Sequence, residues 1–159
     1  MKLYFAALVL SLGLMGPAQA DDWKRYTSAA TGFSISLPTD RFAIEEETAG
    51  RLSLSEIDGT AQLDVFGVTN ADRLTVAQFQ DMMEAADPNR RITYRAVGKS
   101  WFVLSGYLAD EKDPTIFYAK FMLNGAGTAL SAFEISYPKA EKAEYDQVVE
   151  RLEASLTSP

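Results

Sequence analysis

Carboxylates are the residues best able to do chemistry here, because the 159-residue chain contains no histidine and no cysteine. Histidine is the commonest general base and the commonest ligand of transition metals. Cysteine supplies disulfides, thiolate nucleophiles and thiolate metal ligands. Catalytic triads built on histidine are therefore excluded, as are zinc, copper or iron sites that depend on histidine or cysteine.

Paired carboxylates can catalyse hydrolysis without histidine, as they do in glycosidases. The candidate acids fall mainly in expected loops and turns, where solvation is the ordinary explanation; they are Glu45, Glu46, Glu47, Asp58, Asp64, Asp110, Glu111 and Asp113. Asp64 differs because it lies within an expected strand, and there we expect it to be half exposed and paired with a base. The segment 110–113 lacks the spacing of a calcium-binding loop. No metal and no cofactor is therefore expected.

The first twenty residues have the features of a secretory signal peptide. Lys2 is followed by an apolar run from Leu3 to Met15, and Ala18-Gln19-Ala20 matches a small-x-small cleavage signal. The apolar run is shorter than the about 20 residues that cross a bilayer. We expect cleavage after Ala20, a single mature domain over residues 21–159 without membrane insertion, and a location in the periplasm of a Gram-negative bacterium or outside the cell.

The mature chain is acidic. The whole chain has 15 lysines and arginines and 22 aspartates and glutamates, and one lysine lies in the signal peptide, so the mature charge is −8. Nucleic acid and anionic lipid both demand a basic surface, so neither is expected as a partner. The one basic concentration, formed by Arg90, Arg91, Arg95 and Lys99, could bind an anion, but a solvated strand edge is the favoured interpretation.

Aromatic residues are the remaining candidates for a site, and they are densest over residues 100–121. Large residues on inner strands ordinarily form the core. A tyrosine or tryptophan nevertheless combines an apolar body with a polar tip, which suits ligand pockets and interfaces. The candidate contacts for a partner or ligand are Tyr94, Trp101, Tyr107 and Tyr118, with core packing as the favoured alternative.

Hydrophobic periodicity and turn signals predict the elements that must position these residues. Strands are expected over 32–38, 51–56, 62–68, 92–97, 100–108, 115–123 and 129–137, and helices over 74–86 and after Pro138. Residues 21–30 are expected to be a polar lead-in and residues 39–50 an exposed loop. Along residues 92–97, Ile92, Tyr94 and Ala96 are expected on one side. The strands over 100–108 and 115–123 are apolar on both faces, so we expect them to be covered on both.

Short turns make neighbouring strands antiparallel. The expected fold is therefore α+β, with a mainly antiparallel sheet of about seven strands sandwiched between helices in an α/β/α arrangement. The helix over 74–86 is expected to start with a capping box formed by Thr75 and Gln78.

Tyr26 followed by Gly32-Phe33-Ser34-Ile35-Ser36-Leu37-Pro38 resembles the opening of the Mog1/PsbP-like superfamily. The order of the remaining elements is similar, and it ends with a long C-terminal helix that contains Tyr145. The segments from Ile92 to Tyr107 and at Phe117-Tyr118 resemble uncharacterised exported proteins of Gram-negative bacteria. The resemblance implies an antiparallel sheet between helices. Members serve as extrinsic photosystem II subunits, a Ran-binding nuclear factor and exported bacterial proteins, and they share no catalytic set.

Three functions remain after these exclusions. The favoured one is a non-enzymatic, protein-binding accessory module of the cell envelope, whose site is an exposed aromatic patch beside acidic loops. The second is a binder of small apolar ligands, with a pocket between sheet and helix near Phe79, Met82 and Trp101. The third and least favoured, a carboxylate-based hydrolase, requires two acids to meet in a cleft.

Overall fold

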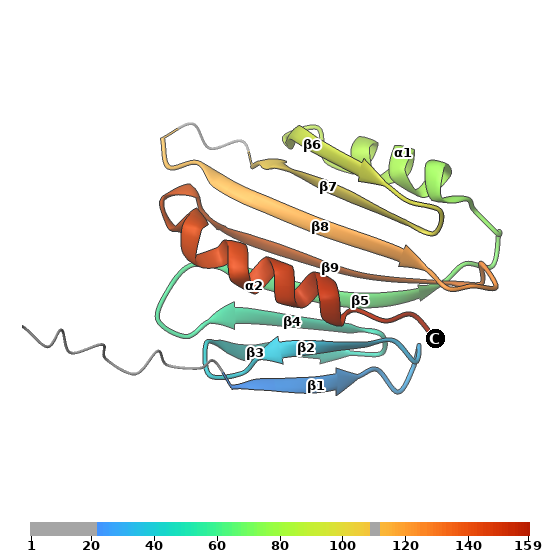
Figure 1. Cartoon of the computed structure of the whole chain (residues 1–159), viewed down its shortest axis with the longest axis horizontal. Coiled ribbons are helices and arrows are strands. Elements are labelled where there is room, and N and C mark those ends of the chain that lie inside the picture. The colour runs from blue at the N-terminus through green and yellow to red at the C-terminus, as the bar shows by residue number, and fades with distance from the viewer. Residues whose placement is uncertain (1–21, 109–111) are drawn as a thin grey trace, which may run out of the picture.

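The computed structural model describes residues 22–108 and 112–159. Within these ranges the chain forms nine strands, one short 3-10 helix and two α-helices (Figure 1). In chain order the elements are β1 (Trp23–Thr27), β2 (Ser34–Pro38), β3 (Phe42–Thr48), β4 (Arg51–Glu56), β5 (Gln62–Thr69), α1 (Val76–Ala86), β6 (Arg91–Val97), β7 (Trp101–Tyr107), β8 (Thr115–Leu123), β9 (Ala129–Pro138), η1 (Lys139–Glu141) and α2 (Lys142–Ser155). None of the helices in these ranges is long and apolar enough to cross a membrane.

Seven strands form one sheet in the order β3-β4-β5-β9-β8-β7-β6. Every neighbouring pair in this sheet is antiparallel. The last strand, β9, lies between β5 and β8 and so joins a three-stranded half, β3 to β5, to a three-stranded half, β6 to β8. With α-helices on both faces, this architecture confirms the expected α+β sandwich.

The sheet has the predicted number of strands, but one member differs from the prediction. The strand predicted over 32–38 is β2, which pairs only with β1 in a separate two-stranded hairpin. The segment predicted to be an exposed loop contains β3, and the predicted lead-in contains β1. All residues of β3 after Phe42 are exposed, including Glu45, Glu46 and Glu47. An edge strand that carries charge on both sides shows no alternation of apolar and polar residues, which explains the wrong prediction.

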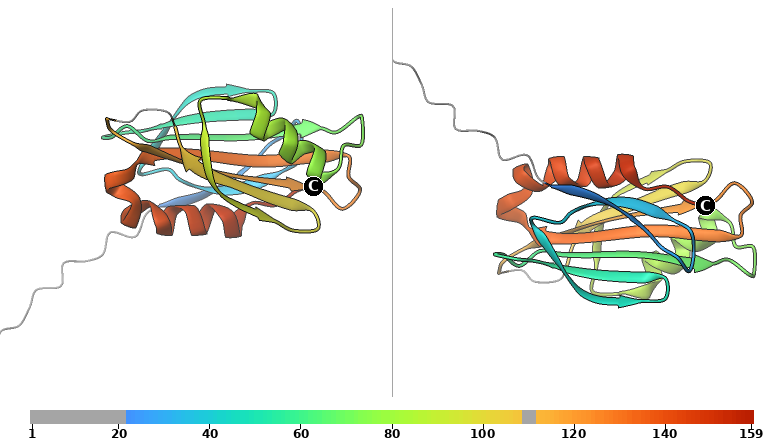
Figure 2. Two further views of the ribbon diagram at one scale, coloured as in Figure 1. Left: turned by 90° about the horizontal axis from the view of Figure 1, so that it is seen from above. Right: turned by 90° about the horizontal axis from the view of Figure 1, so that it is seen from below.

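One face of the sheet is covered by α2 and the β1–β2 hairpin, which lie over β4, β5 and β9 (Figure 2). The helix buries one stripe of residues in this core, namely Tyr145, Val148, Val149 and Leu152. The ring of Tyr145 stacks on Tyr137, with 4.5 Å between their centroids. Two stacked rings and a fully buried leucine fix α2 against the centre of the sheet.

An arginine from the turn before β3 completes this attachment. The guanidinium of Arg41 lies 4.3 Å from the centroid of the Tyr145 ring and forms ion pairs with Glu56 at 2.9 Å and with Glu144 of α2 at 2.8 Å. The hydroxyl of Tyr145 has no well-formed hydrogen bond to a described residue. Burial and the nearby Glu56 carboxylate raise the pKa of this phenol above its ordinary value.

The opposite face is covered by α1, which packs on β7 and β8 in a second core. The helix starts with the predicted capping box, in which the Gln78 amide donates to Thr75 Oγ1 at 3.3 Å and the Thr75 amide donates to Gln78 Oε1 at 2.9 Å. Phe79 is the buried residue of α1 and shares this core with Phe102, Phe117 and Phe121.

The two coverings therefore lie on diagonally opposite halves of the sheet. The helix α2 and the hairpin cover β4, β5 and β9 on one face, whereas α1 covers β7 and β8 on the other. Trp101, Ser105 and Tyr107, on the α2-side face of β7, remain partly exposed. On this side Val103 is buried, so the prediction that the strand is covered on both faces holds there for Val103 and is wrong for the other three residues, because α2 reaches only as far as β8.

The hairpin approaches the sheet closely at Gly67 of β5. A Cβ atom at this position would lie 2.5 Å from Thr31 Oγ1 and 2.7 Å from Phe33 Cδ1, both just before β2. Gly67→Ala is expected to displace the hairpin and to lower the free energy of unfolding by about 1–3 kcal/mol, measured by urea denaturation. Gly125→Ala is the matched control, because a Cβ there meets nothing within 4 Å. Equal losses in the two variants would contradict the close packing.

Candidate functional site

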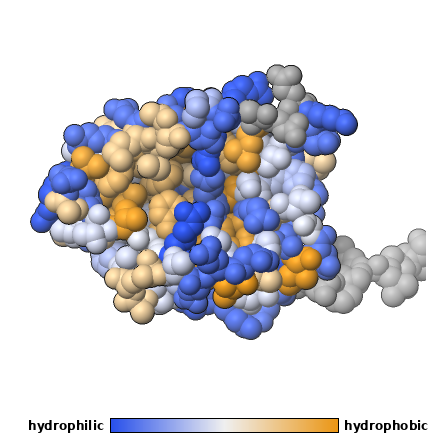
Figure 3. All heavy atoms as spheres, turned by 180° about the vertical axis from the view of Figure 1, so that it is seen from behind, coloured by the Kyte–Doolittle hydropathy of each residue, from blue (hydrophilic) through white to orange (hydrophobic). Residues whose placement is uncertain are grey.

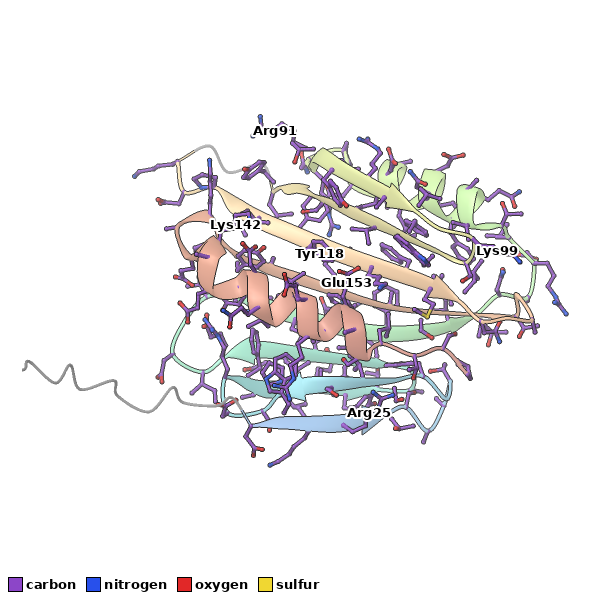
Figure 4. The ribbon with its side chains drawn as sticks, in the orientation of Figure 1. Arg25, Arg91, Lys99, Tyr118, Lys142 and Glu153 are labelled. Atoms are coloured by element: carbon purple, nitrogen blue, oxygen red, sulfur yellow. The ribbon has the colours of Figure 1, made fainter. Side chains whose placement is uncertain are left out.

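A groove of about 510 Å³ lies between α2 and the open face of β6, β7 and β8. We call it the tyrosine groove. Its floor is formed by Tyr94, Ser105, Tyr107, Ile116, Tyr118 and Tyr137, and its wall by Lys142, Asp146, Val149, Glu150 and Glu153 of α2. In Figure 4, Tyr118 lies on β8 beside α2, with Lys142 at the start of that helix and Glu153 near its end.

The strand register explains how the floor is built. Tyr94 pairs with Ser105, and Ser105 pairs with Tyr118, so these three residues form one row across β6, β7 and β8. Residues paired across antiparallel strands share a face, so the two rings stand on either side of a small side chain. The Ser105 hydroxyl donates to the Phe117 carbonyl at 2.8 Å and is therefore satisfied within the sheet.

A β-bulge is needed to place Tyr94 in this row. The register shifts between Ile92 and Tyr94, so Ile92 pairs with Gly106 while Tyr94 pairs with Ser105. Ile92 then packs into the α1 core, and Tyr94 lies on the α2 side. The prediction that Ile92 and Tyr94 lie on the same side of the strand is wrong. The prediction assumed that every second residue faces the same side, and a bulge breaks this rule because it adds one residue to the strand.

The structure brings three of the four sequence-predicted contact residues into the groove. Tyr94 is 54% exposed, and Tyr107 and Tyr118 are partly buried. Trp101 lies on the same face, since it pairs with Met122, but it stands beyond the end of the groove. Tyr137 also contributes to the floor while remaining 3% exposed.

Cations of the chain already stack on aromatic rings at both ends of this face. At one end, Arg91 and Lys139 lie 4.9 Å and 5.4 Å from the centroid of the Tyr107 ring. At the other end, Lys120 Nζ lies 5.5 Å from the Trp101 ring and 3.2 Å from a carboxylate oxygen of Glu153. The sequence did not predict this role of Lys120, although Lys120 is the only charged residue of the strand over 115–123. The structure pairs it with Val103 and Phe133, both buried.

The groove holds its buried phenols in the neutral form. Burial, followed by the charge and hydrogen bonding of Glu153, raises the pKa of Tyr118. Burial, followed by the charge of Asp146, raises the pKa of Tyr137 to about 12. Lys142 Nζ binds the two carboxylate oxygens of Asp146 at 2.7 Å and 2.8 Å. Glu150, between Asp146 and Glu153 on the wall, is exposed and has no ion pair with a residue that the structure describes.

A second, smaller cavity of about 320 Å³ lies on the other face, between α1 and the sheet. Figure 3 shows this face, where a hydrophilic band runs between areas of hydrophobic surface. Asp64 and Glu134 are paired in register at its edge. Asp64 binds Arg51 at 3.0 Å, and Glu134 binds Arg90 through two contacts of 2.6 Å and 2.7 Å. Two acids therefore do meet, but in ion pairs that join β4 to β5 and the turn after α1 to β9, rather than as a free acid and base.

These ion pairs settle two predictions from the sequence. The expected half-exposed Asp64 with a neighbouring base is confirmed, with 32% of its side chain exposed and Arg51 as the base. The basic concentration is only in part a solvated edge, because Arg90 binds Glu134 and Asp87, while Arg95 binds Glu84 of α1 at 2.8 Å.

The apolar pocket predicted near Phe79, Met82 and Trp101 is wrong, because these residues do not meet. Phe79 lies in the α1 core, whereas Trp101 lies on the α2 face, since α1 packs on the Phe102 side of β7. Met82 is 48% exposed. Within residues 22–108 and 112–159, no group of three or more acidic side chains is arranged to hold a metal ion, and part of the acidic segment 110–113 lies outside these ranges.

The raised pKa of Tyr118 predicts a loss of stability at alkaline pH. The folded chain keeps the phenolic proton more tightly than the unfolded chain does, so this contribution is complete below pH 10, the ordinary value, and is lost as the pH rises above it. Tyr118→Phe should therefore show a smaller fall in the free energy of unfolding between pH 9 and pH 11. Urea denaturation measures this fall, and an unchanged fall in the variant would contradict the assignment.

No protein-family model and no curated protein sequence matches the chain. Several solved structures do match, two of which are the following. The Ran-binding protein Mog1p of Saccharomyces cerevisiae has a TM-score of 0.60 and 9% sequence identity, over 87% of this chain and 96% of Mog1p. Cyanobacterial PsbP from Synechocystis has a TM-score of 0.60 and 13% identity, over 93% and 99%. At these identities the likeness is one of fold, and it confirms the fold indicated by the segment from Tyr26 to Pro38: the chain has a Mog1/PsbP-like fold.

Proposed function

We propose that the chain is a non-enzymatic, protein-binding accessory module of the bacterial cell envelope, and that its partner docks in the tyrosine groove. One observation carries this proposal. A row of tyrosines lies on a sheet face that the described chain leaves open, with Tyr94 at 54% exposure. One structural neighbour, Mog1p, is a Ran-binding protein, which supports a role in protein binding for a chain of this fold.

The chemistry of the groove suits a protein partner. Tyrosine offers a large rigid ring with few rotatable bonds and a hydroxyl at its tip, and it is enriched at the centres of protein interfaces. The row that contains Tyr94 and Tyr118 is flanked by charged residues of α2, which gives an aromatic centre and a polar rim. A partner that covers the row would bury the exposed ring of Tyr94.

The proposed location is the periplasm of a Gram-negative bacterium, or the medium outside it. Residues 1–20 support this location through their charged start, apolar run and cleavage signal. A chain without cysteine needs no disulfide formation after export, and its acidic mature surface matches a soluble partner better than an anionic membrane.

A photo-crosslinking amino acid at position 94 tests the docking surface. With p-benzoylphenylalanine in place of Tyr94, irradiation of intact cells should yield one discrete covalent adduct with an envelope protein, identified by mass spectrometry. Ile57 provides the matched control position, because it is 55% exposed but lies in the turn after β4, far along the sheet from β6. Adducts of equal yield at both positions, or none at position 94, would contradict the proposed surface.

The proposed export is tested by the mass of the mature chain. The full chain, expressed in a Gram-negative host, should appear in the periplasmic fraction with Asp21 as its first residue, as read by intact-mass spectrometry. Ala20→Arg removes the small residue before the cleavage point and should leave the precursor uncleaved. A full-length chain in the cytoplasm would overturn the proposed location.

A further inference from the structure

We propose that the middle of the tyrosine groove binds a lysine or arginine side chain from an extended segment of the partner. The side chain would lie between Tyr94 and Tyr118, above Ser105, with its charge directed to Glu150. This inference rests on the proposed function and names the chemistry that the partner must present.

The shape of the floor favours a long, narrow side chain. Tyr94 and Tyr118 are two strands apart in one row, which places their backbones about 10 Å from each other. Only Ser105 lies between them, and its hydroxyl is already bonded to the Phe117 carbonyl. The ring of Tyr118 stacks on Phe133 of β9, and Tyr94, Ser105 and Tyr118 all line the groove. The space above Ser105 is therefore a slot with a small floor and a tyrosine on either side, which a methylene chain or a planar guanidinium can enter.

The charges on the wall make the middle of the groove negative. Three acids of α2 line it, and two of them have cations of the chain as partners. Asp146 is bound by Lys142 at 2.7 Å, and Glu153 is bound by Lys120 at 3.2 Å. Glu150, between these two pairs, has no ion pair with any residue in the described ranges. Its carboxylate gives the slot a fixed negative charge without a positive counterpart.

The chain itself shows that this face holds cations on rings. Lys120 sits between the Trp101 ring and the Glu153 carboxylate, and Arg91 and Lys139 both lie over Tyr107. A cation over an aromatic ring is attracted by the ring quadrupole, and a neighbouring carboxylate adds to that attraction. In the middle of the groove, the same combination of ring and carboxylate is present, but no cation of residues 22–108 or 112–159 stacks on Tyr94 or Tyr118.

The ends of the groove limit the partner to an isolated positive charge. Arg91 and Lys139 at the Tyr107 end would repel a dense run of basic residues, while Glu150 and Glu153 oppose a phosphate backbone. A single lysine or arginine on an otherwise neutral extended segment satisfies both conditions.

Peptide titration provides the test. The full chain is expressed with isotope labels, purified from the periplasm and titrated with the pentapeptide acetyl-Gly-Gly-Lys-Gly-Gly-amide or its glutamine counterpart, with nuclear magnetic resonance as the readout. The lysine peptide should shift the backbone resonances of Tyr94, Ser105 and Tyr118. The glutamine peptide should bind about three- to fivefold more weakly than the lysine peptide. Equal binding of the two peptides would overturn the inference.

Paired variants separate the ring from the charge. Y94F keeps the aromatic ring and should keep the affinity for the lysine peptide, whereas Y94L keeps an apolar side chain and should lose about three- to fivefold. E150Q should lose a similar factor, while D81N removes an exposed acid from α1 on the other face and should change nothing. Equal effects of E150Q and D81N would show that overall charge, and not the slot, attracts the peptide.

The two proposals fail in different experiments. A crosslinked partner at position 94 together with equal binding of both peptides would keep the docking surface and reject the cationic side chain. Selective binding of the lysine peptide without any crosslinked partner would keep the cation-binding slot and reject the protein partner.

Discussion

A seven-stranded sheet has two faces to cover, and this chain covers them with two helices and one hairpin. The strand β9 makes the arrangement possible, because its alternate residues enter both cores. Phe133 and Ile135 pack under α2 and the hairpin, whereas Leu130 and Ala132 pack on the α1 side. Each covering is narrower than the sheet, and the two enclose diagonal halves. The tyrosine groove lies on one of the two areas that remain, and the ion pairs of Asp64 and Glu134 lie on the other face.

The coverings leave one open area on each face of the sheet, and the two areas carry different kinds of side chain. On the α1 side, the chain satisfies its own polar groups, since Arg51 and Arg90 bind the neighbouring acids Asp64 and Glu134. Partly exposed ion pairs of this kind contribute little to stability, about 0–1 kcal/mol each. On the α2 side, aromatic rings stay in contact with solvent instead. Exposed rings that gather on one surface usually mark an interaction site.

Local sequence patterns predicted most elements and failed where the answer depends on distant parts of the chain. The capping box at Thr75 and the period-two strands are local signals, and both were recovered. The strand that pairs with β2 could not be predicted from local sequence. Alternating apolar and polar residues show that one face of a strand is buried, but they do not show which strand lies beside it. Likewise, the residue pattern of β7 is apolar on both faces whether helices cover both faces or only one. A bulge such as that before Tyr94 also cannot be seen in the residue pattern.

The helix α2 presents two separate stripes of side chains. Tyr145, Val148 and Leu152 enter the core, and Asp146, Glu150 and Glu153 border the groove. These stripes lie on adjacent sides of one rigid rod, so residues of the second can be exchanged with little effect on packing of the first. Single substitutions on the outer stripe therefore change the charge and shape of the groove wall while the packed framework that carries it stays in place.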